Sequence, residues 1–259
     1  ELGRTNGREM ARLTAEALGV AAETVLVMST GVIGAQLPMG KIARGITLAA
    51  AALGDDWGAA APALMTTDTR PKSATITALS GSGAFTIAGI AKGAGMIAPN
   101  MATMLAFIVT DAALPAPLLQ KALRGAVETT FNRVVVDGDM STNDTVLLLA
   151  NGASEITPDL KEFSDALHAV CNSLARQIAR DGEGATRFVQ VEVMGAPSDE
   201  EAHQIANTIA MSPLVKTAIY GGDANWGRII AAAGRAGVPL DPDRMTLWVH
   251  GAGSGPPLC

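Results

Sequence analysis

The chain has 259 residues, of which 48% are hydrophobic and only 3% aromatic, and its formal net charge is −6. A chain of this length buries a substantial core and has room for one or two domains. It contains no basic block and no interleaving of basic and aromatic residues, which excludes a typical nucleic-acid partner. No run of eighteen apolar residues occurs, so the sequence predicts no membrane-spanning helix.

The pattern of apolar residues, glycines and prolines predicts both helices and strands. The predicted helices span residues 6–18, 39–53, 115–131, 160–180, 198–211 and 225–236. The predicted strands span residues 24–28, 74–78, 84–91, 104–109, 134–136, 145–150, 188–194 and 245–249. Because these elements mix without strict βαβ alternation, we expect an α+β (mixed α/β) fold with helices outside mixed sheets. A strand–helix pattern restarts after Gly184, which predicts domains at 1–184 and 185–259.

Metal and histidine chemistry find little support in the sequence. The two cysteines, Cys171 and Cys259, form neither a disulfide framework nor a set of metal ligands. The polar segment 137–144 carries three aspartates, but no glutamate closes it as in an EF-hand loop, so we predict no metal site. The three histidines are scattered and do not indicate a triad. With no signal-peptide pattern, we expect a cytoplasmic protein.

The stretch from Lys92 to Val109 has the most informative pattern in the chain. Two glycines follow Lys92, Pro-Asn forms a turn signal, and Met104 begins an apolar run typical of a buried strand. Thr103 lies where that strand begins. Its hydroxyl either caps a backbone group, as strand threonines often do, or acts as a nucleophile.

A threonine nucleophile needs a base close to its hydroxyl. Cleavage of the Ala102–Thr103 bond would give Thr103 a free α-amine, whose pKa of about 7.7–8.0 lets it accept the hydroxyl proton near neutral pH. Ala102 is small and would leave room for the hydroxyl to attack the carbonyl that precedes it. This chemistry predicts acyl transfer through an ester on Thr103.

The motif KGAGMIAPNMATMLAF closely resembles the self-processing site of the ornithine acetyltransferase (glutamate N-acetyltransferase) family of arginine biosynthesis. The resemblance continues through nearly the whole chain, in the motifs MSTGVIGAQLPMGKI, TTDTRPK, FNRVVVDGDMSTNDTVLLLANG, DGEGATRF and GGDANWGRIIAAAGRAG. It implies an αββα sandwich with a smaller C-terminal α/β subdomain, and autocleavage between Ala102 and Thr103. It also implies that the Thr30 hydroxyl and the Gly31 amide form the oxyanion hole, although Ser-Thr-Gly alone is equally typical of a turn.

Three further residues are substrate-binding by the same resemblance, beside Thr103 itself. Thr69 lies in a polar loop whose hydroxyls would otherwise cap turns, and Lys92 would otherwise be a solvated surface lysine. Glu183 lies between two glycines, where an acidic residue is usually solvated. The resemblance places Lys92 near a substrate carboxylate, and Glu183 near the ornithine ammonium.

The implied reaction is a ping-pong transfer of acetyl from N-acetylornithine to glutamate through acetyl-Thr103. No cofactor or metal is expected, although acetyl-CoA is an acetyl donor for some members, and an α2β2 heterotetramer would follow cleavage. A threonine-nucleophile amidohydrolase or aminopeptidase, a paralogue that uses other acyl-amino acids, and an inactive fragment remain open. The resemblance also implies that family segments preceding Glu1 and following His250 lie outside this sequence, including substrate-contacting Asn and Thr residues.

Overall fold

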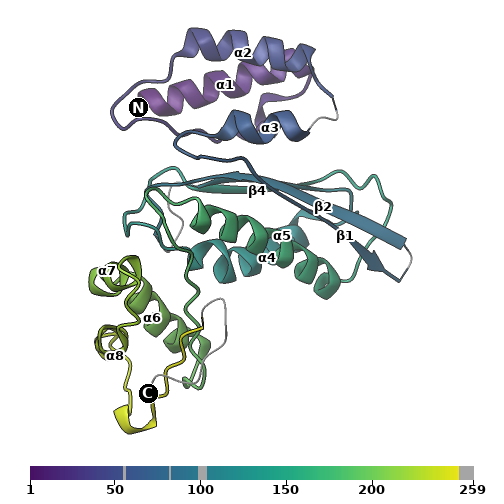
Figure 1. The fold of residues 1–259 in the computed structure, drawn as a ribbon. Coiled ribbons are helices and arrows are strands. Elements are labelled where there is room, and N and C mark those ends of the chain that lie inside the picture. Colours follow the sequence, from purple (N-terminus) through teal and green to yellow (C-terminus); the bar gives the residue numbers. More distant parts are fainter. Residues whose placement is uncertain (55–56, 82, 99–103, 251–259) are drawn as a thin grey trace.

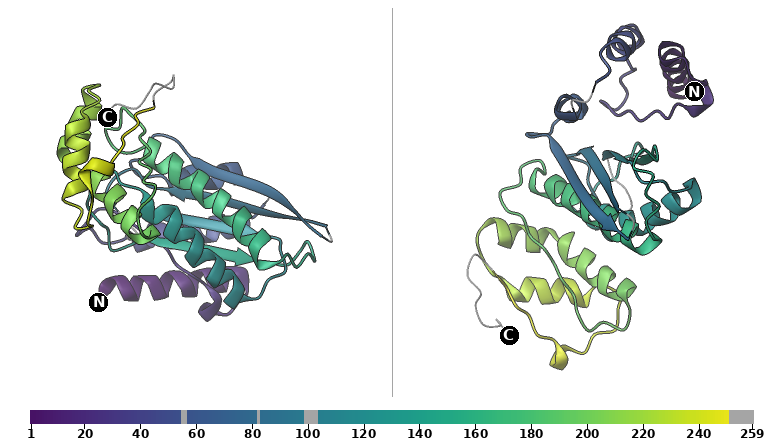
Figure 2. Two further views of the ribbon diagram at one scale, coloured as in Figure 1. Left: turned by 90° about the horizontal axis from the view of Figure 1, so that it is seen from below. Right: turned by 90° about the vertical axis from the view of Figure 1, so that its right-hand side faces the viewer.

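The structure is a computed structural model that describes residues 1–54, 57–81, 83–98 and 104–250. Its elements form three groups along the chain (Figure 1). An N-terminal helical group lies on one face of a central sheet, two helices cover the other face, and a C-terminal helical group lies beyond those helices. The right-hand view of Figure 2 shows the same order from the side.

The N-terminal group holds α1 (Leu2–Leu18), α2 (Met39–Ala51) and α3 (Trp57–Leu64), with a 3-10 turn at Ala22–Thr24. Helix α1 ends because Gly19 adopts the left-handed conformation, with φ of 69°, and its amide bonds back to Ala15. Helix α3 lies against the sheet, where Trp57 stacks on Phe107 with ring centroids 6.1 Å apart. This stacking joins the group to the strands.

The central sheet has the order β1-β2-β3-β4. Its strands are β1 (Lys72–Ser80), β2 (Gly83–Lys92), β3 (Leu105–Thr110) and β4 (Thr145–Ala150). The first two pairs are antiparallel, and β3 runs parallel to β4. The register sets Lys92 opposite Leu105, and Leu105 opposite Thr145. The end of β2 and the beginnings of β3 and β4 therefore share one edge of the sheet.

Helices α4 (Ala116–Thr129) and α5 (Leu160–Arg180) cover one face of this sheet, with a 3-10 turn at Phe131–Arg133 between them. Helix α5 begins at Asp159, whose carboxylate accepts a 2.8 Å hydrogen bond from the Glu162 amide. Its apolar stripe packs on β1 and β2 and is buried, as the 3.6-residue period predicts. This contact forms the main hydrophobic core.

The C-terminal group holds α6 (Asp199–Ala210), α7 (Pro213–Tyr220) and α8 (Trp226–Gly234), followed by a 3-10 turn at Pro242–Arg244. Its apolar side chains form a second cluster, separate from the first. Lys216 on α7 donates a hydrogen bond from Nζ to the Val136 carbonyl and so joins this group to the central one. The division into domains at Gly184 stays a prediction.

A mixed α/β fold with a mixed sheet is confirmed. The second sheet of an αββα sandwich stays a prediction, because the strands in the described part of the chain form one sheet. No helix in that part is long and apolar enough to cross a membrane.

Four predicted strands are wrong within the described residues. Residues 24–28, 134–136, 188–194 and 245–249 pair with no described strand, so the structure assigns no ladder there, although Val25, Val134 and Met245 keep extended backbones. Helices α3 and α7 were not predicted. Pro62 and Gly58 interrupt the helix pattern of α3, and α7 has only eight residues.

Candidate active site

Lys92 ends β2 at the sheet edge where β3 begins. It is 2% exposed, so it is a buried lysine and not a surface one. Burial lowers its pKa, and this effect exceeds the opposite influence of the Asp68, Glu183 and Asp144 carboxylates. The register places Lys92 opposite Leu105, two residues after Thr103 in the sequence.

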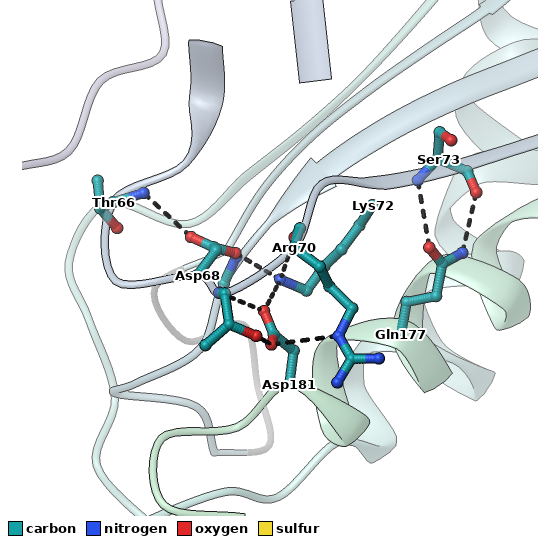
Figure 3. Close-up of polar contacts among 9 residues, drawn as sticks. Thr66, Asp68, Arg70, Lys72, Ser73, Gln177 and Asp181 are labelled. Atoms are coloured by element: carbon teal, nitrogen blue, oxygen red, sulfur yellow. Dashed lines mark hydrogen bonds and ion pairs between the residues drawn. The ribbon is translucent and has the colours of Figure 1, made fainter. Parts of the chain in front are cut away.

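Lys72 is the centre of a buried ion network (Figure 3), and the charges of Lys72 and Asp68 also act on Lys92. The Lys72 ammonium is within 2.6 Å of both an Asp68 oxygen and an Asp181 oxygen, and the three side chains are 0–1% exposed. Asp68 also accepts hydrogen bonds from the amides of Thr66, at 3.1 Å, and Gly93, at 2.7 Å. The network therefore joins the polar loop before β1, the turn after Lys92, and the C-terminal end of α5.

Thr69 is held by this network. Its amide donates to Asp181 Oδ2 at 3.0 Å, and its hydroxyl donates to Asp181 Oδ1. Arg70 Nε lies 3.6 Å from the same Asp181 Oδ1. Thr69 as a whole residue remains exposed, although its amide and hydroxyl bind the buried Asp181 carboxylate.

Glu183 follows two residues after Asp181, in the turn that ends α5. Its amide donates to the Ala94 carbonyl at 2.7 Å, which holds this turn beside the glycine turn after Lys92. A Cβ added at Gly95 would lie only 2.6 Å from a Glu183 carboxylate oxygen. The glycine therefore makes room for the Glu183 carboxylate, and Thr69, Lys92 and Glu183 lie around one network.

The carboxylates of segment 137–144 hold backbone amides at the same edge. Asp137 accepts from the amides of Met96, at 2.7 Å, and Ile97, at 3.0 Å, and Met96 has a left-handed φ of 50°. Asp144 Oδ1 accepts from the Met104 amide at 2.6 Å. These aspartates fix the two described ends of the segment that contains the predicted cleavage site.

The surroundings of Asp144 disfavour the charged form of its carboxyl group. Its Oδ2 atom is buried and has no hydrogen-bond partner among the described residues. Burial raises the pKa of Asp144 to about 6, although the Met104 amide and the Lys92 charge act in the opposite direction. This carboxyl group therefore titrates closer to neutral pH than an ordinary aspartate.

The predicted oxyanion residues are connected to this edge through the neighbouring Asn143. Its side-chain amide donates to the Ser29 carbonyl at 3.0 Å, and Ser29 directly precedes Thr30 and Gly31. Asn143 in turn precedes Asp144, which holds Met104. Thr103, the predicted nucleophile, and Ala102, which precedes the predicted cleavage, lie outside the described residues, so their roles stay predictions.

Asp68, Lys72, Asp181 and Asp144 were not assigned a role from the sequence. One signal was present, since Asp68 and Lys72 are four residues apart in TTDTRPK. Asp181 is 109 residues away from Lys72 along the chain, and only the packing of α5 on β1 brings the two together. Within the described residues, no group of three or more His, Cys, Asp and Glu side chains is arranged to hold a metal.

These polar contacts define the candidate site. A hollow of about 490 Å³ lies away from it, along α1, and is lined by Thr5, Asn6, Arg8, Glu9, Arg12 and Met39. None of the predicted site residues lines it. The hollow is largely open, and we assign it no role.

Comparison with known proteins gives consistent matches. The family model described as "ArgJ family" matches residues 1–254. The arginine biosynthesis bifunctional protein ArgJ of Symbiobacterium thermophilum is 52% identical over 256 residues, which cover 96% of this chain and 64% of that protein. The protein of the same name from Geobacter sulfurreducens is 52% identical over 253 residues, which cover 95% of this chain and 64% of that protein. The chain thus spans slightly less than two thirds of the length of these relatives.

A crystal structure of arginine biosynthesis bifunctional protein argJ from Bacillus halodurans also matches. The two proteins are 51% identical in the matched region, which covers 51% of this chain and 64% of the Bacillus halodurans chain. The TM-score is 0.49. The assignment rests on the sequence matches, which extend over almost every residue of the chain. From these matches, the chain belongs to the ArgJ family.

Proposed function

We propose that this chain carries the acyltransferase site of an arginine-biosynthesis enzyme, which moves acetyl from N-acetylornithine to glutamate. The observation that carries the proposal is the convergence of Thr69, Lys92 and Glu183 around one buried network, at the edge where β3 begins. The names of the relatives, which describe a bifunctional protein of arginine biosynthesis, support the same reaction.

Maturation comes first in this proposal. The Thr103 hydroxyl attacks the Ala102 carbonyl, the peptide bond between them breaks, and an ester forms between the Ala102 acyl group and Thr103 Oγ1. Water then hydrolyses the ester, which leaves chains 1–102 and 103–259 and a free α-amine on Thr103. The contact of Asp144 with the Met104 amide supports this step, because it fixes the residue that follows the nucleophile.

In catalysis, the Thr103 amine accepts the hydroxyl proton while Thr103 Oγ1 attacks the acetyl carbonyl of N-acetylornithine. The proton passes to the departing nitrogen, ornithine leaves, and acetyl-Thr103 remains. The glutamate amine then attacks this ester and carries the acetyl group away. Thr30 and Gly31 donate to the oxyanion in both halves, and loss of one such donor costs roughly 10²–10³ in turnover.

The charges around the site fit two amino-acid substrates. The Glu183 carboxylate accepts from the ornithine ammonium, and the Lys92 ammonium attracts the substrate carboxylate. Lys92 also favours the neutral form of the Thr103 amine, because a nearby positive charge lowers the pKa of an amine. No cofactor takes part in the transfer. Acetyl-CoA as a second acetyl donor and an α2β2 assembly of the cleaved chains are the finer parts of the proposal.

Cleavage provides the direct test. Purified protein is incubated and then analysed by denaturing electrophoresis and intact mass, where we expect two products that correspond to residues 1–102 and 103–259. The T103A variant should remain one chain, and T103S should still be cut, because serine retains a hydroxyl. A wild-type chain that stays intact would contradict the proposed maturation.

Transfer is then measured with N-acetylornithine labelled with ¹³C in the acetyl group. Labelled N-acetylglutamate should form only when glutamate is present, and labelled acetyl-Thr103 should be found by mass when glutamate is omitted. Release of labelled acetate at the same rate with and without glutamate would instead indicate a hydrolase.

A further inference from the structure

The Asp181 carboxylate is surrounded by donors on both oxygens. Oδ2 accepts from the Thr69 amide at 3.0 Å and from the Lys72 ammonium at 2.6 Å. Oδ1 accepts from the Thr69 hydroxyl and lies 3.6 Å from Arg70 Nε. The side chain is 1% exposed, so these protein groups replace water around the carboxylate.

The Lys72 ammonium keeps this carboxylate charged. It has three protons and three acceptors, namely Asp68 Oδ1 and Asp181 Oδ2, at 2.6 Å each, and the Arg70 carbonyl at 3.5 Å. Burial raises the pKa of Asp181, but the hydrogen bonds from Lys72 and Thr69 outweigh it and lower the pKa to about 2. Asp181 is therefore ionised wherever the protein is folded at ordinary pH.

An ionised carboxylate accepts hydrogen bonds and cannot donate them. In the contact between Thr69 and Asp181, the shared proton must therefore come from the threonine hydroxyl. A hydroxyl has one proton and two lone pairs. Once the proton points to Asp181, Thr69 Oγ1 has only lone pairs to offer to any further partner.

We propose that Asp181 makes the Thr69 hydroxyl a hydrogen-bond acceptor toward the substrate, so that Thr69 selects the acetamide N–H of the acetylated amino acid and not its carboxylate. This inference rests on the proposed function, which assigns Thr69 to substrate binding. Glu183 accepts from the ammonium at the other end of ornithine, which leaves the acetamide N–H as the donor for Thr69. Asp181 is thus a positioning residue that determines specificity through Thr69.

The double contact explains why Asp181 can fix this polarity. The carboxylate binds both the amide and the hydroxyl of the same residue, so the Thr69 side chain cannot rotate without losing a charge-assisted hydrogen bond. A carboxylate of the substrate could not form a hydrogen bond with Thr69 Oγ1, because neither oxygen would have a proton to donate. An N–H group would complete the hydroxyl's hydrogen bonding.

The orientation of the hydroxyl is tested without any activity. The Asp181 carboxyl carbon is followed by ¹³C NMR during a pH titration of the wild type, T69V and T69S. Removal of a donated hydrogen bond disfavours the charged form, so the pKa of Asp181 should rise in T69V and remain at the wild-type value in T69S. An identical titration in T69V and in the wild type would show that the hydroxyl does not donate to Asp181 and would overturn the inference.

The selection of an N–H group is tested by calorimetric binding of N-acetylornithine. The D181N amide can donate to Thr69 Oγ1 and so reverse the hydroxyl, which should weaken binding about tenfold. In the T69V background, the same change should weaken binding less than about twofold, because no hydroxyl remains to be reversed. Equal losses in both backgrounds would show a general structural role and refute the inference.

A substrate analogue separates this inference from the proposed function. N-acetylornithine methylated on the acetamide nitrogen cannot donate there, so T69V should weaken binding of the parent compound about tenfold and leave binding of the analogue unchanged. An equal loss for the two ligands would contradict selection of the N–H. If the wild type binds no N-acetylornithine, the proposed substrate is wrong, and the NMR titration still decides the polarity of Thr69.

Discussion

At the scale of single residues, the site depends on aspartates that act on other protein groups. Asp68 and Asp181 compensate Lys72, Asp137 holds the Met96 and Ile97 amides, and Asp144 holds Met104. Each of these four carboxylates also accepts a hydrogen bond from a backbone amide and so holds a loop or strand end in place. Asp144 is different, because its Oδ2 atom has no partner among the residues that the structure describes, and burial opposes ionisation of its carboxyl group.

This difference predicts a pH dependence of stability. The folded-state pKa of Asp144 is about 6, above the ordinary value of 3.8, so the folded state holds its proton in a pH range where the unfolded state has lost it. The Asp144 contribution should therefore reduce the free energy of unfolding as pH rises from about 4 to 6, with no further change above that range.

Urea titrations at several pH values measure this slope. D144N has no titrating carboxyl group at this position and should lack the decrease, whereas D139N, at an exposed aspartate of the same segment, should retain it. Parallel curves for D144N and the wild type between pH 4 and 6 would contradict the assignment.

Sequence reasoning could anticipate part of the site. Thr69, Lys92 and Glu183 stand in motifs that the family resemblance identifies, and the structure gathers them around one network. The burial of Lys92 and the role of Lys72 could not be predicted, because they follow from the packing of segments far apart in the chain, such as Lys72 and Asp181. Long-range ion pairs of this kind leave no local periodicity in a sequence.

At the scale of elements, the sequence predicted most accurately the four strands that pair with one another in the sheet. Strands β1 and β2 form a hairpin, and β3 and β4 lie beside it, close to their predicted bounds. Residues 188–194 alternate in the same way, but Val189 and Met194 remain exposed, and no described strand pairs with them. Apolar alternation alone therefore did not make this segment a strand, because hydrogen-bonded partners determine which segments join the sheet.

The packing of α5 on β2 predicts an effect of substitution at Gly89. A Cβ there would lie 3.0 Å from Leu174 Cδ1 and 3.3 Å from Val170 Cγ1, so the branched side chain of G89V would force the helix away from the strand. We expect a loss of about 1–3 kcal/mol in the free energy of unfolding, although valine is the better strand former.

Denaturation in urea checks this value, with G125A as the matched control. Gly125 is an exposed residue of α4 whose added Cβ would have no neighbour within 4 Å. Alanine there should raise stability by roughly 0.5–1 kcal/mol. A G89V protein as stable as the wild type would show that α5 does not pack closely on β2.

At the scale of the whole molecule, two apolar clusters are joined by polar contacts. The central cluster lies between the sheet and helices α4 and α5, and the second lies among α6, α7 and α8. Lys216 connects them, because its ammonium donates a hydrogen bond to the Val136 carbonyl. Burial lowers the pKa of Lys216. Val136 in turn donates its amide to the Ile97 carbonyl at 2.7 Å, which carries the connection to the candidate site.

This connection predicts a measurable cost for K216M. Methionine keeps the apolar stem but leaves the Val136 carbonyl without its donor, so stability should fall by about 1–3 kcal/mol. Limited proteolysis should then release the C-terminal helices faster than in the wild type.

K161M is the control, because Lys161 forms an exposed pair with Asp165 that is worth at most about 1 kcal/mol. Equal effects of the two substitutions on stability and proteolysis would show that Lys216 does not connect the two groups.

The register of the sheet has a consequence for the order of events in maturation. Strands β1 and β2 precede the proposed scission, and β3, β4, α4 and α5 follow it, yet β2 and β3 are hydrogen-bonded neighbours and α5 rests on both strands of the hairpin. The two polypeptides would remain interwoven in a single sheet, held together without a covalent link. Neither piece holds the complete ladder by itself, so folding would have to precede scission, and pieces separated in denaturant would recover poorly when mixed again.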